Sequence, residues 1–178
     1  MKIGCTAWTI AGGYNLPLDD AVETIGKMGF QGVELIAGTK EHMTEYYTDE
    51  QCDRLAALVE SYGMEVSQLV IYKAIIEGLA SLDRDAQDEA FRLFEQGCRI
   101  AKRLRTKTVN TVSHWIPGLA APIPYLPTYV YVTVPGVEYF EPEMKMTVPD
   151  FDWDEIWNNY VQTIRRCCDI AAEYGLSF

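Results

Sequence analysis

The chain has 178 residues, of which 48% are hydrophobic, so it can bury the core of one domain. Its 15 basic and 26 acidic residues give a net charge of −11 at pH 7, which repels nucleic-acid phosphates and anionic lipids. No apolar run reaches the length of a membrane span, and the run at residues 3–8 is too short for a signal-peptide core. We therefore expect neither nucleic acid nor a membrane as a partner.

The five cysteines are odd in number and lack the spacing of metal or redox sites. Reduced and mostly buried thiols are typical of proteins in a reducing compartment. We accordingly predict a cytoplasmic protein.

Strand-like and helix-like segments alternate along the chain. Four segments have the composition of buried strands: residues 2–8, 32–36, 66–71 and 108–115. Apolar residues at helical spacing follow each of them, at about 17–28, 48–62, 81–104 and 152–174. Leu176 to Phe178 then begins a fifth strand.

Several helix ends carry recognisable signals. Capping boxes occur at Thr48 with Gln51 and at Asp152 with Glu155, and either Ser81 or Asp83 caps the third helix. Glycines end the other helices: Gly29, Gly63 and Gly175. Arg105 stands at the equivalent position of the third helix.

This repeated unit predicts an α/β fold with a parallel sheet and right-handed crossovers. A five-stranded doubly wound domain fits the length, but three residues make a poor last strand. The alternative is a TIM-type (β/α) barrel, which needs eight units. We predict a single partial barrel domain over residues 1–178, made of the first four units and the start of the fifth strand. Both edges of such a sheet are open.

Residues 115–152 form one long insertion above the fourth strand. The insertion holds seven of the eight prolines together with several tyrosines. Loops of this length in compact domains are usually lids or binding loops. We predict a lid or a subunit contact, with an ordered surface loop that has no such role as the alternative, and we expect a homo-oligomer.

The run G-F-Q-G-V-E-L at residues 29–35 resembles the second strand, G-F-x-G-V-E-L, of the xylose-isomerase-like TIM-barrel superfamily, which includes sugar phosphate isomerases and epimerases. Supporting likenesses are Y-G-M-E-V at 62–66, residues 109–115, and I-A-A-E-Y-G-L at 170–176. The resemblance implies an enzyme that shifts a proton next to the carbonyl of a sugar or sugar phosphate. It also implies a divalent metal (Mn, Mg, Co or Zn) for the full-length family member. In the family this metal is held by Glu, Asp, His and Glu side chains at the ends of the fifth to eighth strands. We therefore assign no metal ligand within residues 1–178.

Two residues are candidates for catalysis. Glu34, which we place at the end of the second strand, is expected to be partly desolvated and to bind substrate or act as an acid or base, or else to be an ion-paired residue at the barrel mouth. His114 ends the fourth strand, where ligands of α/β proteins bind. It could bind a substrate hydroxyl or a metal, or simply bond to backbone.

Three further residues are candidates for substrate binding. Trp8 and Trp115 could form an apolar wall for a sugar ring, and Gln68 could bind hydroxyls if it points into the barrel. Ordinary packing is the alternative for the two tryptophans, and a hydrogen bond within the core is the favoured alternative for Gln68. Lys73 is a weaker candidate for a phosphate contact, and His42 is predicted to lie on the surface.

Two other functions remain open. A metal nuclease of the apurinic-endonuclease type would need more histidines and a basic groove. A sugar-binding or assembly half-barrel without catalysis would need a partner to cover its open edges.

Overall fold

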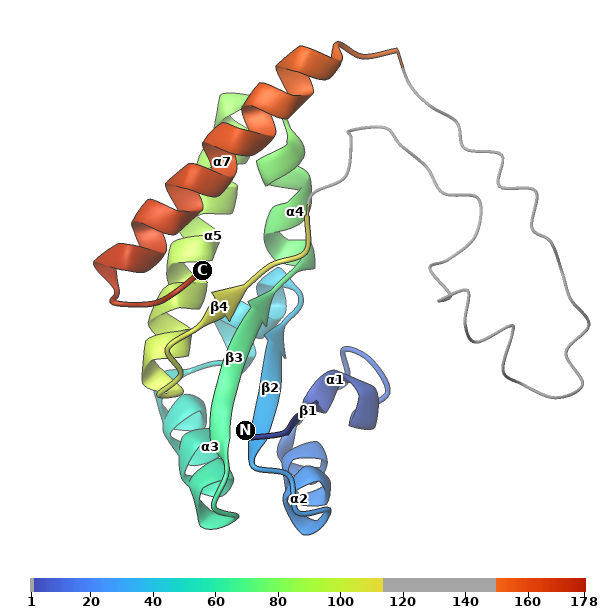
Figure 1. Ribbon diagram of the computed structural model, residues 1–178, viewed down its shortest axis with the longest axis vertical. Helices are drawn as coiled ribbons and strands as arrows, with labels where there is room; N and C mark the ends of the chain where they lie inside the picture. The colour runs from blue at the N-terminus through green and yellow to red at the C-terminus, as the bar shows by residue number, and fades with distance from the viewer. Residues whose placement is uncertain (1, 114–149) are drawn as a thin grey trace, which may run out of the picture.

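The computed structural model describes residues 2–113 and 150–178 (Figure 1). Four parallel strands form one sheet in the order β1-β2-β3-β4. Their bounds are Gly4–Thr6, Gly32–Ala37, Glu65–Ile71 and Val109–Asn110. Because neighbours in the sequence are neighbours in the sheet, the strand order lacks the reversal of a doubly wound domain. The α/β prediction is confirmed, and the strand order is that of the first four strands of a barrel.

Helices connect the strands and pack along the sheet (Figure 1). Their bounds are α1 Ala7–Ile10, α2 Asp19–Lys27, the π-helix η1 His42–Tyr46, α3 Asp49–Ser61, α4 Lys73–Ala80, α5 Arg84–Arg103 and α7 Trp153–Glu173. Strand residues that alternate toward these helices are fully buried, as Val33, Leu35 and Ala37 illustrate in β2. The core therefore lies between the helices and one face of the sheet.

The capping signals behave largely as predicted. The Thr48 side chain accepts a hydrogen bond from the Gln51 amide, and Asp152 accepts from two amides at the start of α7. Asp83, and not Ser81, caps α5. Arg105 has a φ of 64°, the left-handed conformation that Gly63 adopts after α3.

Three boundaries differ from the prediction. The first strand ends at Thr6 because the backbone turns into α1, and α2 begins at Asp19, two residues beyond Pro17. The fourth strand has two residues and not eight: Thr111 to Ser113 are not in a strand, and the remainder of the predicted strand lies outside the described residues. Helix α4 was not predicted at all. The single-domain division and the insertion at 115–152 stay predictions.

The predicted start of a fifth strand is present. Ser177 pairs in parallel with Thr108, its carbonyl accepts a hydrogen bond from the Val109 amide (2.9 Å), and its own amide donates to the Lys107 carbonyl (2.8 Å). The C-terminus consequently lies beside β4 (Figure 1).

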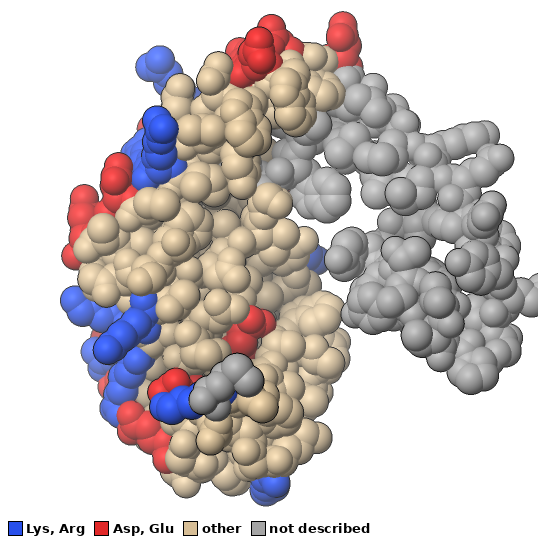
Figure 2. All heavy atoms as spheres, viewed as in Figure 1, with Lys and Arg blue, Asp and Glu red and all other residues tan. Residues whose placement is uncertain are grey.

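Ion pairs join successive helices along the outer layer. Arg54 of α3 pairs with Asp19, Arg103 of α5 with Asp53 (2.6 Å), and Arg166 of α7 with Asp88 (3.3 Å). We call these three pairs the seam pairs. In Figure 2 the charged side chains gather on the rim of the molecule and are sparse over the face in view.

The five cysteines are free, and three of them are buried. Burial raises the pKa of Cys52 to about 11 and that of Cys98 and Cys167 to about 12. In the part of the chain that the structure describes, no helix has the length and apolar character needed to cross a membrane.

Candidate functional site

Glu34 and Gln68 meet on the face of the sheet opposite to the one that the helices cover. They are register partners on β2 and β3, and the Gln68 amide donates a 2.5 Å hydrogen bond to a Glu34 carboxylate oxygen. Both side chains are partly buried. Since a carboxylate can only accept, this bond fixes which end of the Gln68 amide faces Glu34.

The pair sits deeper than a strand end. Glu34 is the third of six residues in β2, and Ile36 and Val70 form the next rung toward the C-terminal edge on the same face. These two apolar side chains are 7% and 8% exposed. The expectation that Glu34 lies at the barrel mouth is therefore wrong, because apolar residues extend the β2–β3 pairing beyond it.

A groove of about 280 Å³ reaches Gln68 from the side of β4. Residues of β4 and of the segments that flank it line one wall: Thr108, Val109, Asn110, Thr111 and Ser113. Tyr160, Ile164 and Cys168 of α7 line the other wall, and Phe178 also contributes. Gln68 is thus accessible despite the apolar rung. His114 and Trp115, which follow Ser113 directly, lie outside the described residues.

An aromatic cluster lies at the C-terminal edge of β1, β2 and β3. Its centre is Tyr14, whose ring stacks on Tyr72 (6.3 Å between centroids) and meets the rings of Trp8 and His42 edge-on. The Lys73 ammonium lies 4.5 Å from the centre of the Tyr14 ring. We call these five residues the Tyr14 cluster.

Close packing holds Tyr14 in place. A methyl group on Gly38, the residue after β2, would lie 2.2 Å from the Tyr14 ring, so the ring rests on bare backbone. Burial, with the neighbouring Tyr72, raises the pKa of Tyr14 to about 12. The phenol is therefore neutral at physiological pH.

Two predictions about this cluster need correction. Trp8 lies in α1 and not at a strand end, although it is 42% exposed and still faces the edge through its contact with Tyr14. His42 is 6% exposed and not a surface residue, and its Nδ1 accepts a hydrogen bond from the Gly38 amide (3.3 Å). The polar sequence around His42 hid the fact that η1 turns its ring inward.

The described residues do not assemble a metal site. No three His, Cys, Asp or Glu side chains gather in a way that could hold a metal ion within residues 2–113 and 150–178. Glu34 offers one carboxylate, and its neighbour Gln68 already donates to it. We derive no chemistry through a metal from these residues.

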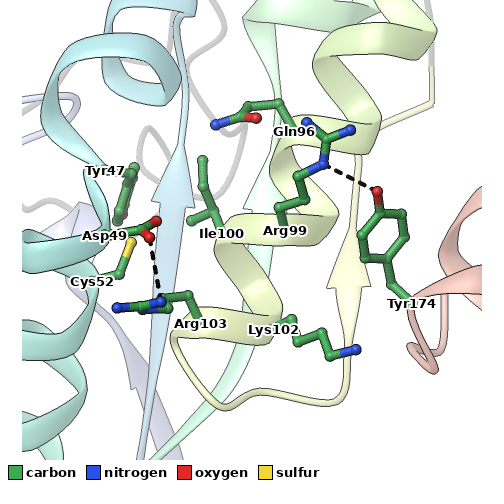
Figure 3. Close-up of a pocket in the computed structure, with 9 residues that line it drawn as sticks. All are labelled: Tyr47, Asp49, Cys52, Gln96, Arg99, Ile100, Lys102, Arg103 and Tyr174. Carbon is green, nitrogen blue, oxygen red and sulfur yellow. Dashed lines mark hydrogen bonds and ion pairs between the residues drawn. The ribbon is translucent and has the colours of Figure 1, made fainter.

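A larger groove of about 470 Å³ lies on the helical side, between α3 and α5 (Figure 3). Its guanidinium groups are already bound: Arg99 bonds to Tyr174 and Glu95, and Arg103 to Asp53. This groove lies on the helix-covered side of the sheet, where α3 packs on α5. We assign it a structural role.

Comparison with known proteins links this fold to one family. The sequence model described as "Xylose isomerase-like TIM barrel" matches residues 22–178. A solved D-psicose 3-epimerase in the presence of D-fructose is 18% identical with a TM-score of 0.68, over 99% of this chain and 50% of that chain. D-psicose 3-epimerase from Clostridium cellulolyticum H10, with D-tagatose, is 17% identical (TM-score 0.69; 99% and 50% coverage).

An IolI protein with a bound zinc atom is 20% identical, with a TM-score of 0.63 over 99% of this chain and 49% of that chain. No curated protein matches the sequence. The chain spans about half the length of these solved structures. At such identities the likeness concerns the fold.

Proposed function

From the premise that this chain belongs to the xylose isomerase-like TIM barrel family, we propose that the whole protein is a sugar or sugar phosphate isomerase or epimerase. Its reaction is a proton shift next to the substrate carbonyl. The observation that carries the proposal is the carboxylate–amide pair of Glu34 and Gln68 beside an open groove. The substrate class is suggested by the solved structures of similar fold that are named as sugar epimerases.

The pair suits a proton transfer near a hydroxyl-rich ligand. Gln68 donates to one Glu34 oxygen and fixes the carboxylate, and the other oxygen has no donor within residues 2–113 and 150–178, so it can accept a proton or a hydroxyl hydrogen bond. The Gln68 carbonyl oxygen is an acceptor for a second hydroxyl. We therefore propose Glu34 as a general base or acid and Gln68 as the residue that positions it and binds substrate.

We assign the other predicted residues by their place in the chain. His114 follows the groove-lining residue Ser113, so we propose a substrate contact for it. We propose that Trp115 forms part of an apolar wall of the sugar site. We propose the same role for Trp8, which belongs to the Tyr14 cluster. The divalent metal that the family resemblance implies would take its ligands from outside the described residues. We further propose a cytoplasmic homo-oligomer.

Hydrogen exchange tests this function. The protein is incubated in D₂O with D-fructose, D-tagatose or D-psicose, and NMR follows deuterium entry at the carbons next to the carbonyl. Loss of a general base typically costs 10²–10⁴-fold, so Glu34→Gln should slow exchange by about 100-fold or more. Glu41→Gln, at an exposed carboxylate, is the matched control. Equal exchange in Glu34→Gln and the parent contradicts the role of Glu34, and no exchange with any of the three ketoses or with their 6-phosphates contradicts the function.

A further inference from the structure

We propose that the substrate is a ketose joined to a second, uncharged sugar ring, and that Trp157 and Trp153 of α7 bind this second ring. The inference rests on the proposed function and narrows its substrate class. It is carried by the groove that reaches Gln68, by a row of aromatic rings that continues this groove along α7, and by the charge around that row.

The groove beside Gln68 has one polar wall and one apolar wall. The β4 side offers amide and hydroxyl groups, those of Asn110 and Thr111 among them, and the α7 side offers apolar groups together with the Tyr160 ring. A sugar ring has hydroxyls around its edge and C–H groups on its faces, so two walls of this kind suit it. A sugar in the groove contacts Gln68 and, through it, the carboxylate of Glu34.

A row of aromatic rings leads from this groove along α7. The Tyr160 ring stacks on the Trp157 ring (5.7 Å between centroids, 23° between planes), and Trp157 stacks in turn on Trp153 (6.3 Å, 18°). We call these three residues the α7 aromatic row. It runs toward the start of α7, at the end of the molecule to which β3 and β4 point (Figure 1). Because Tyr160 also lines the groove, a ligand that extends from Gln68 past Tyr160 meets Trp157 next.

The two tryptophans leave about half of their surface accessible. Trp153 is 58% exposed and Trp157 is 51% exposed. Rings whose centroids lie this far apart while their planes are nearly parallel are offset, so they do not cover one another. A patch of exposed apolar surface with a polar rim marks a binding site, unlike apolar residues that are scattered singly. The α7 aromatic row therefore offers ring faces to a ligand.

Polar contacts on the opposite side of the helix fix the row in place. The Asn159 amide donates to the Leu79 carbonyl (3.2 Å) and its oxygen accepts from the Gln87 amide (2.6 Å), which ties α7 to the connection between α4 and α5. Side chains two positions apart on a helix differ in direction by about 200°. Trp157 consequently points away from this anchor, and its ring is presented on a helix that is already held.

The charge around the row selects the kind of ligand. Residues 150–164 include no lysine or arginine, and their four acidic side chains are all exposed: Asp150, Asp152, Asp154 and Glu155. Acidic side chains accordingly gather at the upper end of the molecule in Figure 2. Their field repels phosphate groups, so neither a phosphorylated sugar nor a nucleic acid fits the row. An uncharged sugar ring combines the required apolar face with the absence of negative charge.

Calorimetric titration with D-fructose and isomaltulose tests the inference. Isomaltulose is D-fructose with a glucose ring on its sixth carbon, and its carbonyl and the neighbouring hydroxyls remain free. It should bind about tenfold more tightly than D-fructose, the gain expected when a ring packs on one or two aromatic side chains. D-fructose 6-phosphate, which carries a charged group on the same carbon, should not share this gain.

Two variants and a matched control locate the effect. Trp157→Ala should weaken isomaltulose binding by about three- to tenfold and so remove most of its advantage over D-fructose, whereas Trp157→Phe should keep most of it. Met28→Ala is the control, because Met28 is also an exposed apolar side chain (60%) but lies after α2 at the opposite end of the sheet. Alanine is a better helix former than tryptophan, so Trp157→Ala should keep its helix content, which circular dichroism checks.

The outcomes separate the inference from the proposed function. If isomaltulose has no advantage, or keeps it in Trp157→Ala, the inference is wrong while deuterium exchange with the simple ketoses still supports the proposed function. An equal gain for D-fructose 6-phosphate, or loss of the advantage in Met28→Ala, also contradicts the inference. If light scattering shows that Trp157→Ala turns an oligomer into monomers, a second copy covers the row and the inference is wrong. If neither sugar binds, the proposed function fails and the inference fails with it.

Discussion

Replacing Gly38 by alanine tests the packing on which the Tyr14 cluster depends. The new methyl group would lie 2.2 and 2.3 Å from two carbons of the Tyr14 ring, well inside contact distance. The ring would have to move away, which breaks its stack on Tyr72 and its contact with Lys73. Gly38 does not have the left-handed backbone that favours glycine, so the backbone itself tolerates alanine.

Two opposing effects set the size of the change. Overpacking in a filled site costs about 1–3 kcal/mol. Alanine also restricts the unfolded chain, which stabilises the fold by about 0.4–1 kcal/mol. The net prediction for Gly38→Ala is a loss of about 1–2 kcal/mol in the free energy of unfolding.

The assay is urea unfolding followed by circular dichroism at the helical band, with linear extrapolation to water. The same substitution is made in a Tyr14→Ala background, where the methyl group has no ring to displace. There Gly38→Ala should be neutral or slightly stabilising, and the difference between backgrounds is the coupling energy.

Equal losses in both backgrounds would refute this reasoning. Such a result would mean that the cost of the methyl group comes from elsewhere, for example from the bond between the Gly38 amide and His42. The Tyr14 cluster would then no longer be a tightly packed unit.

Three further predictions concern local features. Arg105→Gly should unfold at a higher urea concentration than Arg105→Ala, because glycine adopts the φ of 64° without strain; the reverse order would show that this backbone relaxes. A thiol reagent at pH 8 should modify the exposed Cys168 first and spare Cys98, whose pKa burial raises to about 12; fast labelling of Cys98 would contradict the buried core. The raised pKa of Tyr14 favours its neutral form in the fold, so its contribution to stability is complete below pH 10 and is lost as the pH rises toward 12. Stability measured across this range should therefore fall less in Tyr14→Phe than in the parent, and equal slopes would contradict the burial of the phenol.

Features encoded by neighbouring residues were predictable from the sequence. Thr48 and Asp152 cap helices through amides two or three residues away, and the apolar runs of β2 and β3 leave one register that buries their helix-facing sides. The Glu34–Gln68 contact was not foreseen as a pair. Both residues were candidates, but the register that joins them depends on a shift between Val33 and Glu34.

The Tyr14 cluster could not be found in this way. Tyr14 lies in a loop with no periodic pattern, and its partners come from three separate connections. A hint was present in Gly38, a small residue directly after a buried strand, where a close approach can be expected. The polar residues next to His42 in the sequence led to the wrong prediction of a surface position. The burial of its ring is decided by the fold around it and not by adjacent residues.

The seam pair between Arg103 and Asp53 makes the contact between α5 and α3 sensitive to acid. Arg103 holds the pKa of Asp53 below its usual value, so this pair stabilises the fold at neutral pH and is lost as the pH falls through that lowered pKa. The apolar contacts beneath the helices do not titrate. Acid should therefore loosen the contact between α3 and α5 while both helices remain packed on the sheet through their apolar faces.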